Sequence, residues 1–145
     1  MPKFNLRHFL SLVLPIIAAT TVSCTMFIRT PPASEFGRTR ASDGGQYRAT
    51  IVPTGDSIPK HKLQSWTLHI ETAAGEPVDG ETILVAGGMP QHGHGLPTKP
   101  VVTKLPAKGD YLVQGLKFNM GGWWVVKFRV NGATPADSIV FNIKL

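Results

Sequence analysis

The sequence predicts an all-β fold, an antiparallel sandwich of about seven strands. Short runs of strand-forming residues follow one another at regular spacing, separated by clusters of Gly, Pro, Asn and Asp, which is typical of sandwiches and barrels. Apolar and polar residues alternate within several runs, and no stretch has a convincing helical period. Because the chain has 145 residues, one domain with one core is expected.

Residues 1–23 are predicted to be a signal peptide. Lys3 and Arg7 form a basic start, and a largely apolar stretch follows over residues 9–22. This stretch contains Pro15 and is shorter than the roughly 20 apolar residues that a membrane-spanning helix needs. A cleaved export signal is therefore favoured over a retained transmembrane helix.

The single cysteine, Cys24, directly follows this segment. The stretch Thr21-Val22-Ser23-Cys24 resembles the lipobox at which bacterial lipoproteins are cleaved and lipidated, although Thr21 stands where that motif most often has leucine. We expect a lipid-anchored protein on the periplasmic side of a bacterial membrane; the alternative is ordinary cleavage nearby and a free thiol. With one cysteine, an intramolecular disulfide cannot form.

Residues 24–45 are predicted to be a flexible tether, because they are rich in Pro, Ser, Thr, Gly and Arg without periodicity. Loss of residues 1–23 would leave 13 basic and 9 acidic side chains, a net charge of +4. The basic residues are scattered and do not interleave with aromatic residues as they would on a nucleic-acid surface. A nucleic-acid partner is therefore not expected.

The folded domain is predicted to occupy residues 46–145, with strands at 46–53, 63–71, 82–88, 100–104, 110–118, 122–130 and 138–145. Apolar residues at every second position define one face of three of these strands. On the last strand, for example, Asn142 and Lys144 fall on the opposite, polar face. The predicted core comprises Trp66, Leu68, Ile70, Trp124, Val126, Phe128, Val130, Ile139, Phe141, Ile143 and Leu145.

The connection between the third and fourth predicted strands, residues 88–99, has an unusual length and content. Sandwich loops commonly have two to six residues, and a longer loop tends to be functional or disordered. This one contains Met89, His92 and His94, with prolines on both sides. Thioether sulfur favours Cu(I) and imidazole accepts either oxidation state of copper, whereas zinc would be expected to recruit cysteine or a carboxylate. The loop therefore predicts a copper site.

Met120 is a fourth candidate ligand, in the segment 118–124. In an immunoglobulin-type arrangement the third predicted strand pairs antiparallel with the sixth, which brings Met120 beside the loop. By the same topology the connection that contains Asp56 and His61 lies at this pole, and His61 is a candidate fifth ligand. Trp123 is a candidate to stack over the metal or shield it. The alternatives are a methionine that fills a gap in the core and solvated histidines.

The same residues resemble a known family. The blocks are Met89-Pro90-Gln91-His92-Gly93-His94-Gly95-Leu96-Pro97-Thr98, Gly109-Asp110-Tyr111 and Leu116-Lys117-Phe118-Asn119-Met120-Gly121-Gly122-Trp123-Trp124. In order and spacing they are similar to the YtkA-like group of exported domains, related to the FixH proteins, over about residues 60–145. The resemblance implies an immunoglobulin-like β-sandwich, often lipid-anchored, linked to copper handling and the assembly of respiratory copper enzymes. Unlike FixH, this chain is not predicted to retain a transmembrane segment.

The expected function is copper binding through Met89, His92, His94 and Met120, with Cu(I) favoured over Cu(II). The ion would be stored or passed to a copper-accepting envelope protein or a respiratory oxidase assembly factor. The alternative is a metal-free envelope module that contacts another protein through its loop. An enzyme is not expected, because a histidine-brace oxygenase needs histidine at the mature amino terminus and no serine or cysteine is paired with histidine in a recognisable motif.

Overall fold

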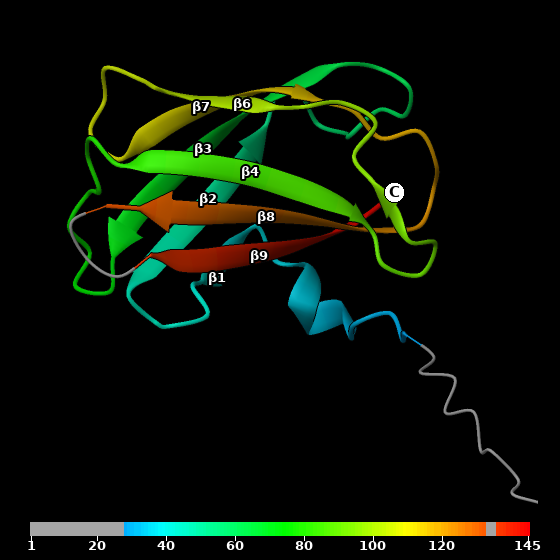
Figure 1. Cartoon of the computed structure of the whole chain (residues 1–145), viewed down its shortest axis with the longest axis horizontal. Helices are drawn as coiled ribbons and strands as arrows, with labels where there is room; N and C mark the ends of the chain where they lie inside the picture. Colours follow the sequence, from blue (N-terminus) through cyan, green and yellow to red (C-terminus); the bar gives the residue numbers. More distant parts are fainter. Residues whose placement is uncertain (1–27, 133–135) are drawn as a thin grey trace, which may run out of the picture.

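The computed structural model describes residues 28–132 and 136–145, and within them nine strands form two antiparallel sheets that pack face to face (Figure 1). The first sheet has the order β1 (Thr39–Ala41), β2 (Tyr47–Pro53), β3 (Gln64–Thr72), β7 (Asp110–Leu116) and β6 (Val101–Lys104). The second has the order β5 (His94–Gly95), β4 (Thr82–Met89), β8 (Trp123–Asn131) and β9 (Asp137–Lys144). This order is that of an immunoglobulin-like sandwich, which confirms the predicted fold class.

The seven predicted strands correspond to β2, β3, β4, β6, β7, β8 and β9, and their ends agree to within two residues. The two remaining strands, β1 and β5, are short and were not predicted. The predicted signal peptide and Cys24 lie outside the described residues. No helix in the described part of the chain is both long and apolar enough to span a membrane.

The core lies between the sheets and follows the predicted alternation. All the predicted core side chains are buried except Leu145, which is half-buried against the others. Each fully buried large apolar side chain stabilises the fold by roughly 1.5–3 kcal/mol. At one end of the core three aromatic rings pack together: Phe118 lies 5.8 Å from Trp66 and 5.2 Å from Trp124, measured between ring centroids.

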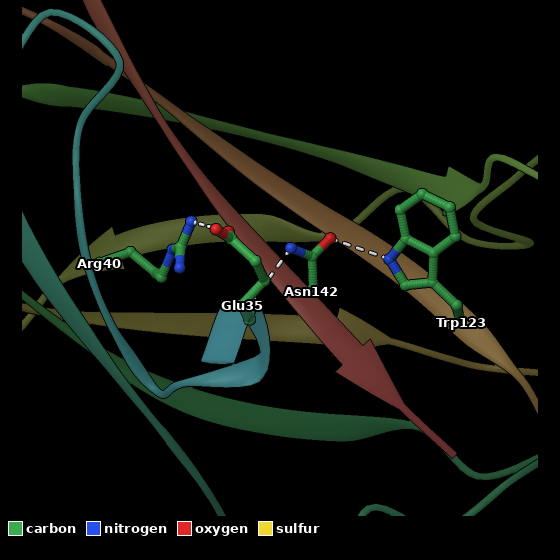
Figure 2. Close-up of polar contacts among 4 residues, drawn as sticks. All are labelled: Glu35, Arg40, Trp123 and Asn142. Atoms are coloured by element: carbon green, nitrogen blue, oxygen red, sulfur yellow. Dashed lines mark hydrogen bonds and ion pairs between the residues drawn. The ribbon is translucent and has the colours of Figure 1, made fainter. Parts of the chain in front are cut away.

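Part of the expected tether is built into the sandwich. The short 3-10 helix η1 (Ala33–Phe36) lies against β9, and β1 pairs with β2. Asn142 lies on the outer face of β9, where the alternation predicts an exposed residue, but η1 covers it and leaves it buried. Its amide nitrogen Nδ2 donates a hydrogen bond of 3.1 Å to the carbonyl oxygen of Glu35, and the Glu35 carboxylate pairs with Arg40 (Figure 2).

The loop before β2 is fixed by the buried carboxylate of Asp137. The backbone N–H of Gly44 donates to this carboxylate at 2.9 Å and that of Ser138 at 2.7 Å. Burial alone would raise the pKa of Asp137, but hydrogen bonds from the Ser42 side chain and from the backbone of Gly44, Ser138 and Gln46 outweigh it and lower the pKa. Residues 42–46 therefore belong to the folded domain.

The strands run between two poles. We call "site pole" the end formed by the β2–β3 connection (54–63), the β4–β5 hairpin, residues 117–122 and the carboxyl terminus. The opposite pole carries residues 42–46, 73–81 and 105–109. The predicted pairing of β4 with β8 is confirmed, with Gly88 opposite Val125. It places the methionine- and histidine-rich loop beside the segment that contains Met120 (Figure 1).

Candidate functional site

A tight hairpin at the site pole positions Met89 and His94. The backbone N–H of His92 donates to the carbonyl of Met89 at 3.1 Å, and Gly93 completes the turn with φ +64°. The chain then forms β5, in which His94 stands directly opposite Met89 and Gly95 opposite Gly88. Because directly opposite residues of an antiparallel pair extend from the same face, the side chains of Met89 and His94 are neighbours.

Two glycines allow the hairpin to approach this closely. A Cβ atom at Gly88 would lie 2.2 Å from the carbonyl oxygen of His94, and one at Gly87 would lie 2.4 Å from that of Val125. Real Cβ atoms do not approach backbone oxygens to such distances. The glycine pair therefore sets how close β5 and β8 can come to β4.

Met89 reaches from the hairpin into the end of the core and is 2 % exposed. Its methyl carbon Cε lies 3.1 Å from the point that a Cβ at Gly122 would occupy. Gly122 has φ +119°, which side-chain-bearing residues rarely adopt. Its backbone exchanges two hydrogen bonds, of 2.9 and 3.0 Å, with that of Leu145. The carboxyl terminus is thereby held at the site pole.

Met120 lies across from the hairpin and is 44 % exposed. The indole Nε1 of Trp124 donates a hydrogen bond of 3.0 Å to the Met120 carbonyl oxygen. The buried Trp124 ring therefore fixes the backbone that carries Met120.

These side chains line a cavity of about 300 Å³ that opens at the site pole. Three of the four predicted ligands, Met89, His94 and Met120, contribute to its wall, and the remaining wall consists of Gly95, Pro97, Asn119 and Trp124. His92 does not line it. Its exposed ring stands beside that of His94, with centroids 6.2 Å apart and planes 8° from parallel.

The structure does not bring the other two candidates to the cavity. His61 belongs to the site pole, where its backbone N–H donates to the Phe118 carbonyl oxygen at 2.7 Å, but its side chain does not line the cavity. Trp123 lies on the outer face of β8, and its indole Nε1 donates to the Asn142 side-chain oxygen at 2.8 Å (Figure 2). The tryptophan that lines the cavity is Trp124, which the alternation predicts only as a core residue.

The donor groups at the cavity are two thioethers and one imidazole. This set is soft, which suits Cu(I) better than zinc, magnesium or calcium. Within residues 28–132 and 136–145, no group of three or more His, Cys, Asp or Glu side chains could hold a metal ion.

A second, shallower hollow of about 390 Å³ lies on the outer face of the second sheet. Its floor is formed by Gly87 and Gly88 of β4, and its sides by Val125 and Lys127 of β8 and by the hairpin. The absence of side chains at the two glycines accounts for the depression.

The profile of the YtkA-like family matches residues 42–129, which is more than half of the chain. This match begins earlier than the resemblance described from the sequence motifs, which starts at about residue 60. No curated protein matches the sequence. Among solved structures, the ZirS C-terminal domain is similar, with 15 % identity, a TM-score of 0.43, and coverage of 98 % of this chain and 100 % of that one. The chain is a member of the YtkA-like family.

Proposed function

We propose that the protein binds copper, as Cu(I), in the cavity at the site pole. The observation that carries this proposal is the convergence of Met89, His94 and Met120, from two segments about 30 residues apart, on one cavity of about 300 Å³. Thioether sulfur is a ligand that Cu(I) favours and hard cations do not, and imidazole completes a three-coordinate soft site.

The four ligands have different surroundings, which suggests different roles. Met89 is buried and held by its neighbours, whereas His92, His94 and Met120 are open to solvent. His92 stands next to His94 but outside the cavity, so it is suited to receive the ion first or replace a ligand during transfer. A site with exposed, exchangeable ligands on a loop suits handover to a partner more than permanent storage.

The proposal places the protein outside the cytoplasm, anchored in a bacterial membrane by lipid on Cys24. The support is the basic and apolar amino-terminal segment followed by the lipobox-like residues Thr21 to Cys24. The partner would be a copper-accepting envelope protein or an assembly factor of a respiratory oxidase. The protein would act by binding and transfer, not by catalysis.

The hollow on the outer face of the second sheet favours one alternative, a metal-free envelope module. Its floor is bare backbone at Gly87 and Gly88, and Val125 and Lys127 form an apolar and a charged edge. Such a surface could receive part of another protein without any metal. In that case His92 and His94 would serve protein contact only.

Titration of the protein with Cu(I) against a competing chelator, alongside Cu(II) and Zn(II), separates these functions. Copper binding predicts tight one-to-one Cu(I) uptake that His94→Ala and Met120→Leu each weaken at least tenfold. The control His69→Ala removes an imidazole of β3 that does not line the cavity, and it should have no effect. Excess Cu(I) at a hundred times the Kd should stabilise the fold by about 2.7 kcal/mol. Absence of Cu(I) uptake above background would favour the metal-free module.

A further inference from the structure

Charge is unevenly distributed between the two poles. All nine acidic side chains lie in the described residues. Only Asp56 is at the site pole, and Glu35 is in η1. The other seven are at or beside the opposite pole: Asp43, Glu71, Glu76, Asp79, Glu81, Asp110 and Asp137. The site pole instead carries Lys60, Lys62, Lys117 and Lys144.

The site-pole lysines are available for external contacts. Lys60, Lys62 and Lys144 are exposed and Lys117 is half-buried. No ion pair joins any of the four to a described acidic side chain. At the opposite pole, by contrast, Lys104 pairs with Asp79 and Arg48 with Glu71, each at 2.6 Å. The four lysines outnumber the single acidic side chain there, Asp56, so the site pole carries an excess of basic side chains.

Apolar side chains are exposed on the same pole. Leu63 directly follows Lys62 and is 68 % exposed, and Met120 is 44 % exposed. Ile28 is 52 % exposed, and the amide nitrogen Nε2 of Gln91, at the hairpin tip, donates to the Ile28 carbonyl oxygen at 3.2 Å. Basic and apolar side chains together are the combination that binds anionic lipid surfaces.

The same contact fixes where the chain leaves the domain. Gln91 also donates to the Thr30 hydroxyl at 3.2 Å, so the first described residues lie at the tip of the hairpin. Ile28 follows Cys24 by four residues, which can span at most about 14 Å when fully extended. A membrane anchor at Cys24 would therefore hold the site pole, and not the opposite pole, close to the bilayer.

We propose that the site pole docks on anionic phospholipid headgroups. Lys60, Lys62, Lys117 and Lys144 contact the headgroup charges, and Leu63 and Met120 enter the interface. The mouth of the cavity then faces the membrane on which the protein sits. This inference does not depend on copper, because its charges and apolar side chains are present without metal.

The test uses the full chain reconstituted in vesicles, with no metal. A fluorescent amino acid that reports polarity replaces Leu63 in one variant and Ala74, in the exposed β3–β4 turn of the opposite pole, in another. In phosphatidylglycerol vesicles the probe at position 63 should shift to the blue and resist quenching by acrylamide, while the probe at 74 should not. Phosphatidylcholine vesicles or high salt should abolish the difference.

Charge-reversal variants supply the matched control. Lys60→Glu with Lys62→Glu should reduce docking, by roughly fivefold for each lysine charge removed from the anionic surface. The control Lys108→Glu with Arg129→Glu changes the net charge by the same amount, but both residues lie toward the opposite pole. This variant should dock as the wild type does. Equal quenching at positions 63 and 74 in phosphatidylglycerol vesicles would overturn the proposal. The proposal would also be overturned if the probe at position 63 were protected from acrylamide in native membranes but not in these vesicles. That result would identify a protein partner instead.

Discussion

Met89 and His94 stand directly opposite each other across the β4–β5 hairpin, one side chain buried in the core and the other open to solvent. A metal ion held by both would therefore be joined on one side to a side chain that is packed in the core. On the other side it would remain exposed for exchange. The hairpin geometry that creates this pair depends on a few glycines and can be tested directly.

Gly88→Ala should disrupt the hairpin, because the new Cβ would lie 2.2 Å from the His94 carbonyl oxygen. We expect β5 to separate from β4, Cu(I) affinity to fall at least tenfold, and Tm to fall by several degrees, as determined by chelator competition and calorimetry. Gly95→Ala changes the residue paired with Gly88, but its Cβ would meet nothing closer than the Gly87 carbonyl oxygen, at 3.8 Å. An equal loss of Tm in both variants would contradict the close-approach explanation.

Gly122→Ala should lower stability by about 1–3 kcal/mol, because alanine is strained at φ +119° and its Cβ would press on Cε of Met89 at 3.1 Å. Denaturant unfolding measures the change. The adjacent Gly121→Ala is the control, since its Cβ would make only ordinary contacts, the nearest being 3.5 Å to the Leu145 carbonyl oxygen. Equal stability of the two variants would show that Gly122 tolerates a side chain.

Asp137→Asn should destabilise the protein at pH 7 by roughly 1.5–3 kcal/mol, because the buried carboxylate accepts charge-assisted hydrogen bonds from the backbone N–H groups of Gly44 and Ser138. The folded state lowers the pKa of Asp137. Its contribution is therefore fully present above the usual aspartate pKa of about 3.9 and is lost as pH falls through the lower folded pKa.

Chemical denaturation at a series of pH values tests this sign. The difference in unfolding free energy between wild type and Asp137→Asn should narrow as pH is lowered below about 4. Asp56→Asn, at an exposed position, should change stability by less than 0.5 kcal/mol at every pH. A difference between wild type and Asp137→Asn that stays constant down to pH 2 would contradict this account.

Asn142→Ala should release η1 from the outer face of β9, because the asparagine side chain joins the Trp123 indole to the Glu35 carbonyl. Loss of both hydrogen bonds should lower stability by about 1–3 kcal/mol. Trypsin should then cleave faster after Arg38 and Arg40, which mass spectrometry can follow. Asn131→Ala, at the end of β8, should leave the rate of cleavage unchanged. If both variants resist trypsin as wild type does, Asn142 does not hold this segment.

Cys24→Ser should abolish lipid attachment. Intact-mass measurement of the protein expressed in a bacterial host should show a diacylglyceryl modification on the wild type and none on the variant. Ser23→Ala keeps a small residue before the cysteine and should be lipidated as the wild type is. A wild-type protein whose Cys24 reacts with maleimide would show instead that the thiol is free.

Regular alternation made the core predictable. The apolar positions of β3, β8 and β9 are buried as expected. Side chains of a strand alternate between its two faces, so only one register places all the apolar residues in the core. The pairing of β4 with β8 follows from the strand order of the fold, and it correctly placed Met120 near Met89. Asn142 could not be predicted, since its burial depends on η1, more than 100 residues away in the sequence.

The candidate site was predicted in part. Met89, His94 and Met120 line one cavity as the loop content suggested, but His92 does not, because it belongs to the turn and not to β5. The two-residue strand β5 consists of histidine and glycine and has no strand-forming composition. It pairs with β4 because Gly87 and Gly88 have no side chains and let the two backbones come close together. A pattern of apolar residues carries no sign of such a pairing.

The two hydrogen bonds between Leu145 and Gly122 affect how the protein should be prepared. They hold Leu145 beside Gly122, and Gly122 lies next to the side chain of Met89. A polyhistidine tag added after Leu145 would therefore bring foreign imidazoles close to the cavity. Such a fusion would take up copper whatever Met89 and His94 do. The exposed turn around Ala74, at the opposite pole, is the position where a purification handle would leave metal measurements interpretable.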